Sequence, residues 1–309
     1  DGADAPWGFT SANTTISANT NYIVSFTFDA NTSMTGTIDT YLNGALFGTL
    51  TGIGRIYNHN PANFGAQVND GYYHDGADSD SNYYYSGGIA EFIFYNKVLN
   101  DSELNSLHNY LSSKYDINIS GVDNYSYDSS ADNFDYHYIS IQRQSAADNH
   151  LNTAEGTGII TIEENDALAD NDYLAIATNE FENSNLESLS YGCSATNKTL
   201  YKLTSNWRAQ KSGTFSTSNF TLNLDDFGPS FTSEEVTMLV SSNSSFSSPT
   251  EINATSVTSN IANFENVTIN DGDYISFAIA KVESADIVPG GVSTLLNTRF
   301  WYQSESLDL

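Results

Sequence analysis

A short acidic loop carries the residues best suited to chemistry in this sequence. Its polar members are Asp75, Asp78, Asp80 and Asn82. They include an Asp-x-Asp-x-Asn pattern, which can turn several side-chain oxygens inward from one loop, and Ca²⁺ prefers oxygen ligands of this kind. The loop lacks the Gly and the bidentate Glu of an EF-hand, so that loop type is excluded. The pattern predicts a Ca²⁺ site, and the alternative is a solvated acidic loop.

A second candidate Ca²⁺ site lies in a stretch rich in Asp, Asn, Ser and Tyr. Its acidic members are Asp123, Asp128, Asp132 and Asp135. Shorter acidic pairs occur at Asp170 with Asp172 and at Asp271 with Asp273. An acidic turn without an ion is the alternative for each group. Because there are several groups, we expect at least one of them to bind Ca²⁺.

Tyrosines flank the first acidic loop and suggest a binding surface. They are Tyr72, Tyr73, Tyr83, Tyr84 and Tyr85. Aromatic rings beside a Ca²⁺ loop can stack on sugar rings, because they present a large apolar face with a polar tip. This predicts a glycan or peptide ligand bound in a Ca²⁺-dependent way. Packing within the loop, or contact with another subunit, is the alternative.

Catalytic patterns are weak in this chain. Glycoside hydrolysis requires two carboxylates held across the sugar bond, and the best-placed predicted strand, residues 89–95, carries Glu91 alone. The five histidines fall in predicted loops or on the predicted helix, with no nucleophile-elbow motif near them; they are His59, His74, His108, His137 and His150. We therefore expect a protein that is not an enzyme.

Charge and length narrow the class of protein further. The 309 residues suffice for two domains, and a net charge of −28 makes nucleic acid and anionic membranes poor partners. No apolar run approaches the roughly 20 residues of a membrane span. Cys193 is the only cysteine, so no intramolecular disulfide forms. We expect a secreted, extracellular protein whose signal peptide has been removed before Asp1.

The elements that must position these residues begin with strands and one helix. Alternating residues predict a strand over 22–28, and a hairpin over 37–42 and 45–50 is indicated by Asn43 and Gly44, since Asn-Gly favours a type I′ turn. A further strand is predicted over 88–95. A capping residue at Asn100 or Asp101 starts a helix that ends near Tyr115. Its predicted apolar face is Leu104, Leu107, Tyr110 and Leu111.

Beyond residue 120 the pattern is β throughout. Strands are predicted over 138–143, 158–163, 173–178, 199–203, 214–224, 236–241, 263–269 and 274–282. Turn signals separate them at short intervals, as in an antiparallel sandwich. The prediction is an all-β protein with two antiparallel β-sandwiches and one short helix. Its domains are residues 1–120, residues 121–283 and a tail over 284–309.

Three motifs in the first domain occur in a specific order. They are Tyr41-Leu-Asn-Gly44, Gly87-Gly-Ile-Ala-Glu-Phe-Ile-Phe-Tyr-Asn-Lys-Val-Leu-Asn-Asp-Ser-Glu-Leu104 and Tyr110-Leu-Ser-Ser-Lys-Tyr-Asp-Ile117. Together they resemble the closing half of a LamG-like domain, the concanavalin A-type jelly roll of large bacterial surface proteins. Residues 138–143, 170–174, 206–213 and 271–277 resemble the β-sandwich that often follows it. That family usually has Gly where Ser140 and Gln142 stand here.

The C-terminal tail resembles the opening of the same LamG-like domain. That opening has a Pro-Gly-Gly-Val turn and an aromatic strand, which no segment before residue 20 matches but Pro289-Gly-Gly-Val292 and Arg299-Phe-Trp-Tyr302 do. The resemblance implies that the tail completes a truncated first domain. The residues expected to enter it are Val292, Leu295, Leu296, Phe300, Trp301 and Tyr302.

Three explanations of the tail remain open at this point. It exchanges into the next copy and builds a fibre or surface layer, it folds back onto its own chain, or it begins a further unit of a longer adhesin. We expect the first of these, a structural surface protein that assembles head-to-tail with copies of itself. The second hypothesis is a Ca²⁺-dependent adhesin module that binds a glycan or peptide.

Overall fold

The computed structural model describes residues 16–29, 35–53, 66–67, 83–84, 86–129, 131–145, 149–188, 200–228 and 230–280. The chain divides into two compact units, each described by itself below. Unit 1 comprises Asp1–Asn124 with Gln144–His150, and unit 2 comprises Tyr125–Arg143 with Leu151–Leu309. The described residues form antiparallel sheets and one α-helix, which confirms the predicted all-β class.

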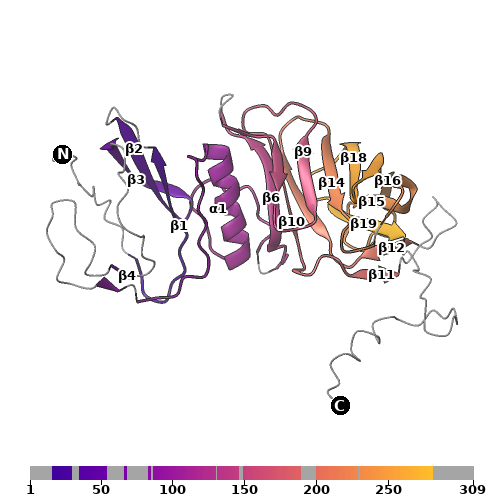
Figure 1. Ribbon diagram of the computed structural model, residues 1–309, viewed down its shortest axis with the longest axis horizontal. Coiled ribbons are helices and arrows are strands. Elements are labelled where there is room, and N and C mark those ends of the chain that lie inside the picture. The colour runs from indigo at the N-terminus through magenta and orange to yellow at the C-terminus, as the bar shows by residue number, and fades with distance from the viewer. Residues whose placement is uncertain are drawn as a thin grey trace, which may run out of the picture. The chain divides into compact units, whose positions relative to one another are not determined.

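Unit 1 contains a three-stranded antiparallel sheet in the order β1-β2-β3 (Figure 1). The strands are β1 (Val24–Asp29), β2 (Gly36–Leu42) and β3 (Ala45–Ile53), and a separate pair joins β4 (Ala66–Gln67) to β5 (Tyr83–Tyr84). The β2–β3 hairpin turns at Asn43 and Gly44, whose φ angles are 45° and 78°. Both angles are positive, as a type I′ turn requires, so the predicted hairpin is confirmed.

The helix α1 (Asp101–Tyr115) begins at a capping box. The Asn100 side chain accepts a hydrogen bond from the Glu103 amide at 2.9 Å, and the Glu103 carboxylate accepts one from the Asn100 amide at 3.1 Å. These two bonds satisfy amide groups that lack partners within the helix. The helix ends at Asp116, which adopts a left-handed conformation with φ 51°. The predicted position and cap of the helix are confirmed.

Unit 2 is built mainly from two antiparallel sheets (Figure 1). Within the described residues, the nine-stranded sheet contains β6 (Tyr136–Arg143), β7 (His150–Leu151), β10 (Tyr173–Thr178), β11 (Leu186–Ser188), β12 (Leu200–Leu203), β13 (Trp207–Ser212), β15 (Val236–Ser241), β16 (Thr250–Asn253) and β19 (Tyr274–Ala280). The five-stranded sheet contains β8 (Thr153–Glu155), β9 (Ile160–Glu164), β14 (Ser218–Asn223), β17 (Ser256–Thr258) and β18 (Ile261–Val267). A short 3₁₀ turn, η1 (Ser233–Glu235), precedes β15.

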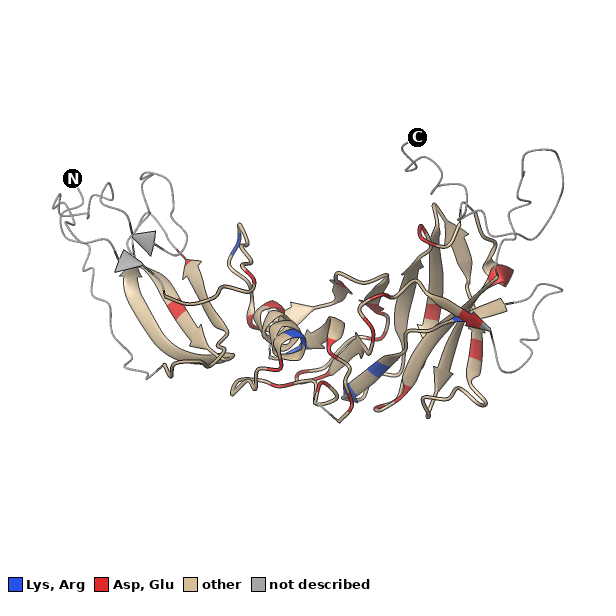
Figure 2. Cartoon of the chain, turned by 90° about the horizontal axis from the view of Figure 1, so that it is seen from below, with Lys and Arg blue, Asp and Glu red and all other residues tan. Residues whose placement is uncertain are grey.

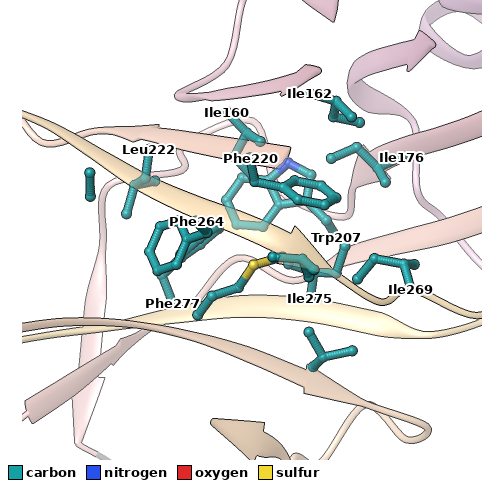
Figure 3. Packing of buried hydrophobic residues seen from close by; sticks show 14 of the residues in the cluster. Ile160, Ile162, Ile176, Trp207, Phe220, Leu222, Phe264, Ile269, Ile275 and Phe277 are labelled. Atoms are coloured by element: carbon teal, nitrogen blue, oxygen red, sulfur yellow. The ribbon is translucent and has the colours of Figure 1, made fainter. Parts of the chain in front are cut away.

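The core of unit 2 lies between these two sheets, as Figure 3 shows. Phe220 and Phe264 come from the five-stranded sheet, whereas Trp207 and Phe277 come from the nine-stranded sheet. The rings of Phe264 and Phe277 meet across the interface with centroids 5.5 Å apart. Inner-face side chains that interdigitate in this way define a β-sandwich.

Acidic residues greatly outnumber basic residues in this protein. In the cartoon of Figure 2, more of the described chain is coloured red, for Asp and Glu, than blue, for Lys and Arg. This distribution follows the sequence totals, which are 38 acidic against 10 basic residues. Among the helices that the structure describes, none is long and apolar enough to cross a membrane.

Candidate assembly surface

The described sheet of unit 1 has an apolar face that is partly exposed. The register places Phe26 opposite Thr40 and Phe28 opposite Ile38, so the two phenylalanines lie on one face. Phe26 is 69% exposed, and Phe28 and Ile38 are half-buried. Of the hydrophobic residues described in unit 1, only Ile23 and Leu104 are buried. The described part of unit 1 therefore contains little of the core that a sandwich requires.

Residues 88–95 supply a second exposed apolar surface in unit 1. The structure assigns no strand over them, so the prediction of a strand here is wrong. Their exposure nevertheless alternates, since Phe92 and Phe94 are 63% and 80% exposed but Ile93 between them is 36% exposed. All five large apolar residues of the segment are nevertheless exposed, and Glu91 alone is half-buried. The segment has the side-chain pattern of a strand without belonging to a described sheet.

Glu91 fixes this segment, residues 88–95, to helix α1. Its carboxylate accepts hydrogen bonds from the Tyr110 hydroxyl at 3.2 Å, the Lys114 ammonium at 3.0 Å and the Tyr115 hydroxyl at 2.9 Å. Although partial burial acts in the opposite direction, the bonds from Lys114 and Tyr115 hold the pKa of Glu91 below its ordinary value. The carboxylate is thus ionised and paired, so it holds residues 88–95 next to helix α1.

Helix α1 turns a polar face toward the protein, which corrects the predicted packing. Leu104 is buried as expected, but Leu107, Tyr110 and Leu111 are only half-buried. The fully buried positions are instead mostly polar, namely Ser102, Asn105, His108, Asn109, Ser112 and Ser113. The predicted apolar stripe of the helix runs through Leu104, Leu107, Tyr110 and Leu111. The described residues of unit 1 leave the last three of these partly exposed. The stripe adds to the apolar surface of the unit.

His108 bridges helix α1 and strand β1. Its Nε2 and the Ser25 hydroxyl share a hydrogen bond of 2.7 Å, and its ring lies 5.7 Å from that of Tyr41. Burial lowers the pKa of His108 to about 4, so the ring is neutral at pH 7. A catalytic serine–histidine pair needs a third group that orients the other ring nitrogen, and His108 Nδ1 has no hydrogen-bond partner in the described residues. We interpret this contact as structural.

Several predicted site residues lie outside the described residues. These are Tyr72, Tyr73, Asp75, Asp78, Asp80, Asn82, Tyr85, Val292, Leu295, Leu296, Phe300, Trp301 and Tyr302. Of the tyrosine group, Tyr83 and Tyr84 form β5, where they pair with Gln67 and Ala66 of β4. The Ca²⁺ loop and its glycan or peptide ligand therefore stay predictions.

The second acidic stretch reaches the sheet of unit 2 through an arginine. Asp132 pairs with Arg208, whose guanidinium carbon lies 3.6 Å from the ring centroid of Tyr127 and 5.1 Å from that of Tyr274. Tyr125 is buried beside this group and donates to the Arg208 carbonyl at 3.0 Å. Such an ion pair stacked on aromatic rings holds a loop in place without a metal.

No three His, Cys, Asp or Glu side chains come together as a metal site within the part of the chain that the structure describes. Asp123, Asp128, Asp132 and Asp135 are therefore not gathered there into one cluster of carboxylates. The shorter pairs serve their turns: Asp172 accepts from the Ala169 amide at 3.0 Å, and Asp273 accepts from the Asn270 amide at 2.8 Å. Local hydrogen bonds of this kind explain acidic residues in turns.

We predict that Asp132→Asn lowers the free energy of unfolding of unit 2 by about 1 kcal/mol, because the pair is partly exposed and partly screened. The loss should be the same in excess Ca²⁺ and in EDTA, as measured by urea denaturation. Glu251→Gln, which neutralises an exposed carboxylate on β16, is the control and should change stability little. A loss that appears only with Ca²⁺ would show instead that Asp132 is a ligand.

In a comparison with known protein families, one family model matches this chain. The family model described as a domain of unknown function (DUF8202) matches residues 107–273, which include most of helix α1 and nearly all of the described sandwich of unit 2. No curated protein and no solved structure matches the chain.

Proposed function

Because the chain belongs to the DUF8202 family, whose description names no activity, we propose its function from the surface of unit 1. The protein is a non-enzymatic, extracellular structural protein, and it builds a fibre or surface layer by head-to-tail strand exchange. In this arrangement the C-terminal segment of one copy completes unit 1 of the next copy.

The observation that carries this proposal is the uncovered apolar surface of unit 1. Phe26, Phe94 and the half-buried stripe of α1 expose hydrophobic area that a finished domain buries. Burying one such aromatic side chain contributes roughly 1.5–3 kcal/mol, so the unit gains stability when a partner covers it. Apolar area exposed on an otherwise polar protein is typical of interaction sites.

The chain itself contains a segment suited to this surface. Residues 288–302 begin with a Pro-Gly-Gly sequence and continue with an apolar, aromatic run whose composition favours a β-strand. A strand added to another domain binds through main-chain hydrogen bonds, while its alternate side chains fill pockets. When each copy donates to the next and the contact does not close into a ring, the product is a filament.

Deleting residues 286–309 tests the proposal. We expect the full-length chain to form large assemblies at micromolar concentration, visible by electron microscopy and light scattering, and the deleted chain to be monomeric. The sandwich of unit 2 should melt unchanged in the deleted chain, because the last of its described strands, β19, ends at Ala280. Polymers of unchanged length after the deletion, or a full-length chain that stays monomeric, would contradict strand exchange.

A further inference from the structure

We propose that Lys202 and Asn206 form an amide cross-link within the chain, in which the ε-amine of Lys202 becomes bonded to the side-chain carbonyl carbon of Asn206. Glu187 is the group that takes the proton from the amine. The site lies in the nine-stranded sheet of unit 2, so the inference does not depend on the assembly proposed above.

The two side chains meet at an interruption in the sheet. Strands β12 and β13 both pair with β19, where Lys202 lies opposite Ala278 and Trp207 lies opposite Ile275. Residues 203–206 separate the two positions on one side, whereas residues 276–277 separate them on β19. The extra residues form a bulge, and bulges redirect side chains. Here Lys202 and Asn206 face one another across it.

The amine and the amide are already in contact. Nζ of Lys202 lies 2.9 Å from Oδ1 of Asn206. Because a C=O bond is about 1.2 Å long, Nζ lies within about 4.1 Å of the carbonyl carbon. Reacting atoms in a near-attack geometry lie about 3–3.5 Å apart. The terminal torsion of asparagine is soft, so the remaining approach requires no movement of the backbone.

Backbone hydrogen bonds hold Asn206 in this position. Its amide donates to Oδ1 of Asn179 at 3.0 Å, and its carbonyl accepts from the Asn179 amide at 3.2 Å. The Ser276 hydroxyl donates to the Ser205 carbonyl at 3.0 Å, which fixes the bulge to β19. Groups held together in this way react as if at very high concentration, because the entropy of bringing them together has already been lost.

The amine of Lys202 lies in surroundings that favour a nucleophile. Lys202 is 8% exposed, and its Nζ lies 5.1 Å from the ring centroid of Phe246, which is fully buried. Burial lowers the pKa of Lys202, although the Glu187 carboxylate acts in the opposite direction. The neutral amine, which is the nucleophilic form, is therefore easier to reach here than in an exposed lysine.

Glu187 is placed to accept the proton. It lies directly opposite Lys202 in the β11–β12 ladder, and its Oε1 is 3.1 Å from Nζ. A carboxylate at this distance serves as a general base. The bond between Nζ and the Asn206 carbonyl carbon forms, and the bond from that carbon to Nδ2 breaks. The departing nitrogen takes up the protons that the lysine gives up and leaves as ammonium, so the step needs no oxidant, reductant or co-reactant.

The product suits the same surroundings better than the reactants do. A buried ammonium ion is costly unless it is fully paired, whereas an amide N–H requires a single acceptor. The Leu203 carbonyl already accepts from Nζ and is available to the amide. The cross-link therefore removes a buried charge and leaves no donor of Lys202 without an acceptor.

Mass spectrometry of the purified full-length chain tests the proposal. A linked chain is lighter by one ammonia molecule than its sequence requires. Trypsin does not cut after Lys202 in a linked chain, because the enzyme requires a free lysine side chain. The peptide that contains residues 202–206 should therefore remain intact and carry the mass deficit. Lys211, whose amine donates to the Ile269 carbonyl instead, is the internal comparison and should be cut normally.

Two variants identify the groups that react. Asn206→Ser removes the acyl group and should restore both the full mass and cleavage after Lys202. Glu187→Gln keeps the shape of the side chain but cannot accept the proton, so it should slow the appearance of the link at least about tenfold. Glu251→Gln, on the exposed part of β16, is the matched control and should leave that rate unchanged.

Three results would overturn the cross-link. Full mass with complete cleavage after Lys202, even after prolonged incubation at neutral pH, would show that the lysine is a structural cation of the bulge. A mass deficit with cleavage retained would show that Asn206 has lost ammonia by closing onto its own backbone. A deficit that persists in Asn206→Ser would show that another residue is the acyl partner.

Discussion

Trp207→Ala is expected to lower the free energy of unfolding of unit 2 by about 3–5 kcal/mol, the range for deleting a large buried aromatic side chain. Trp207 is 1% exposed, and its indole meets the Phe277 ring edge-on with centroids 6.0 Å apart. The residue pairs with Thr178 on one side and Ile275 on the other, so β13 holds it between β10 and β19. Strands on both sides prevent the collapse that would fill the cavity.

The loss should appear in urea denaturation of the full chain and in faster hydrogen exchange of β10, β13 and β19. Trp207→Phe keeps most of the volume and should cost about half as much or less. Phe181→Ala removes an exposed ring and is expected to change stability by less than about 0.5–1 kcal/mol. A loss below about 1 kcal/mol for Trp207→Ala would mean that the two sheets do not enclose this side chain as described.

Local chemistry explains which elements were predictable from the sequence. Asn43 and Gly44 fix a turn through their own backbone preferences, and Asn100 with Glu103 caps a helix within four residues. Strands such as β14 alternate because one face is buried in the sandwich. In β10, β15 and β19 nearly every residue is buried, so their apolar runs indicated strands without clean alternation. By contrast, β13 was not predicted from the sequence. The buried residues Trp207 and Ala209 alternate with polar ones, as in a strand, but the segment contains too few apolar residues for this alternation to stand out.

The errors have a different physical origin, since they depend on distant partners. Alternation over residues 88–95 describes side-chain faces, but it does not contain the ladder of hydrogen bonds that defines a strand. The buried face of α1 includes His108, whose hydrogen-bond partner Ser25 lies 83 residues away and is not part of the leucine spacing. The ion pair of Asp132 with Arg208, 76 residues away, was likewise not predicted, because Asp132 was grouped only with its acidic neighbours in the sequence. No local pattern contains these pairings.

His108 is expected to make the stability of unit 1 depend on pH. Its pKa is lowered by burial to about 4 in the folded chain, whereas an ordinary histidine has a pKa of 6.5. Between these two values the unfolded chain binds the proton and the folded chain does not. Stability should therefore fall as the pH decreases from about 6.5 to about 4, by up to about 3 kcal/mol, and this contribution should change little outside that window.

The variant His108→Gln removes the contribution of histidine protonation to the stability of unit 1. Glutamine keeps a hydrogen-bonding group near Ser25 but does not titrate in this range. Other groups titrate in both chains, so the quantity to compare is the difference in unfolding free energy between the parent and the variant at each pH. That difference should narrow or reverse from pH 7 to pH 4 as the parent loses stability. The His108 ring protons in an NMR titration should shift near pH 4, and a midpoint near 6.5 would show that the ring is solvated and that α1 does not bury it against β1.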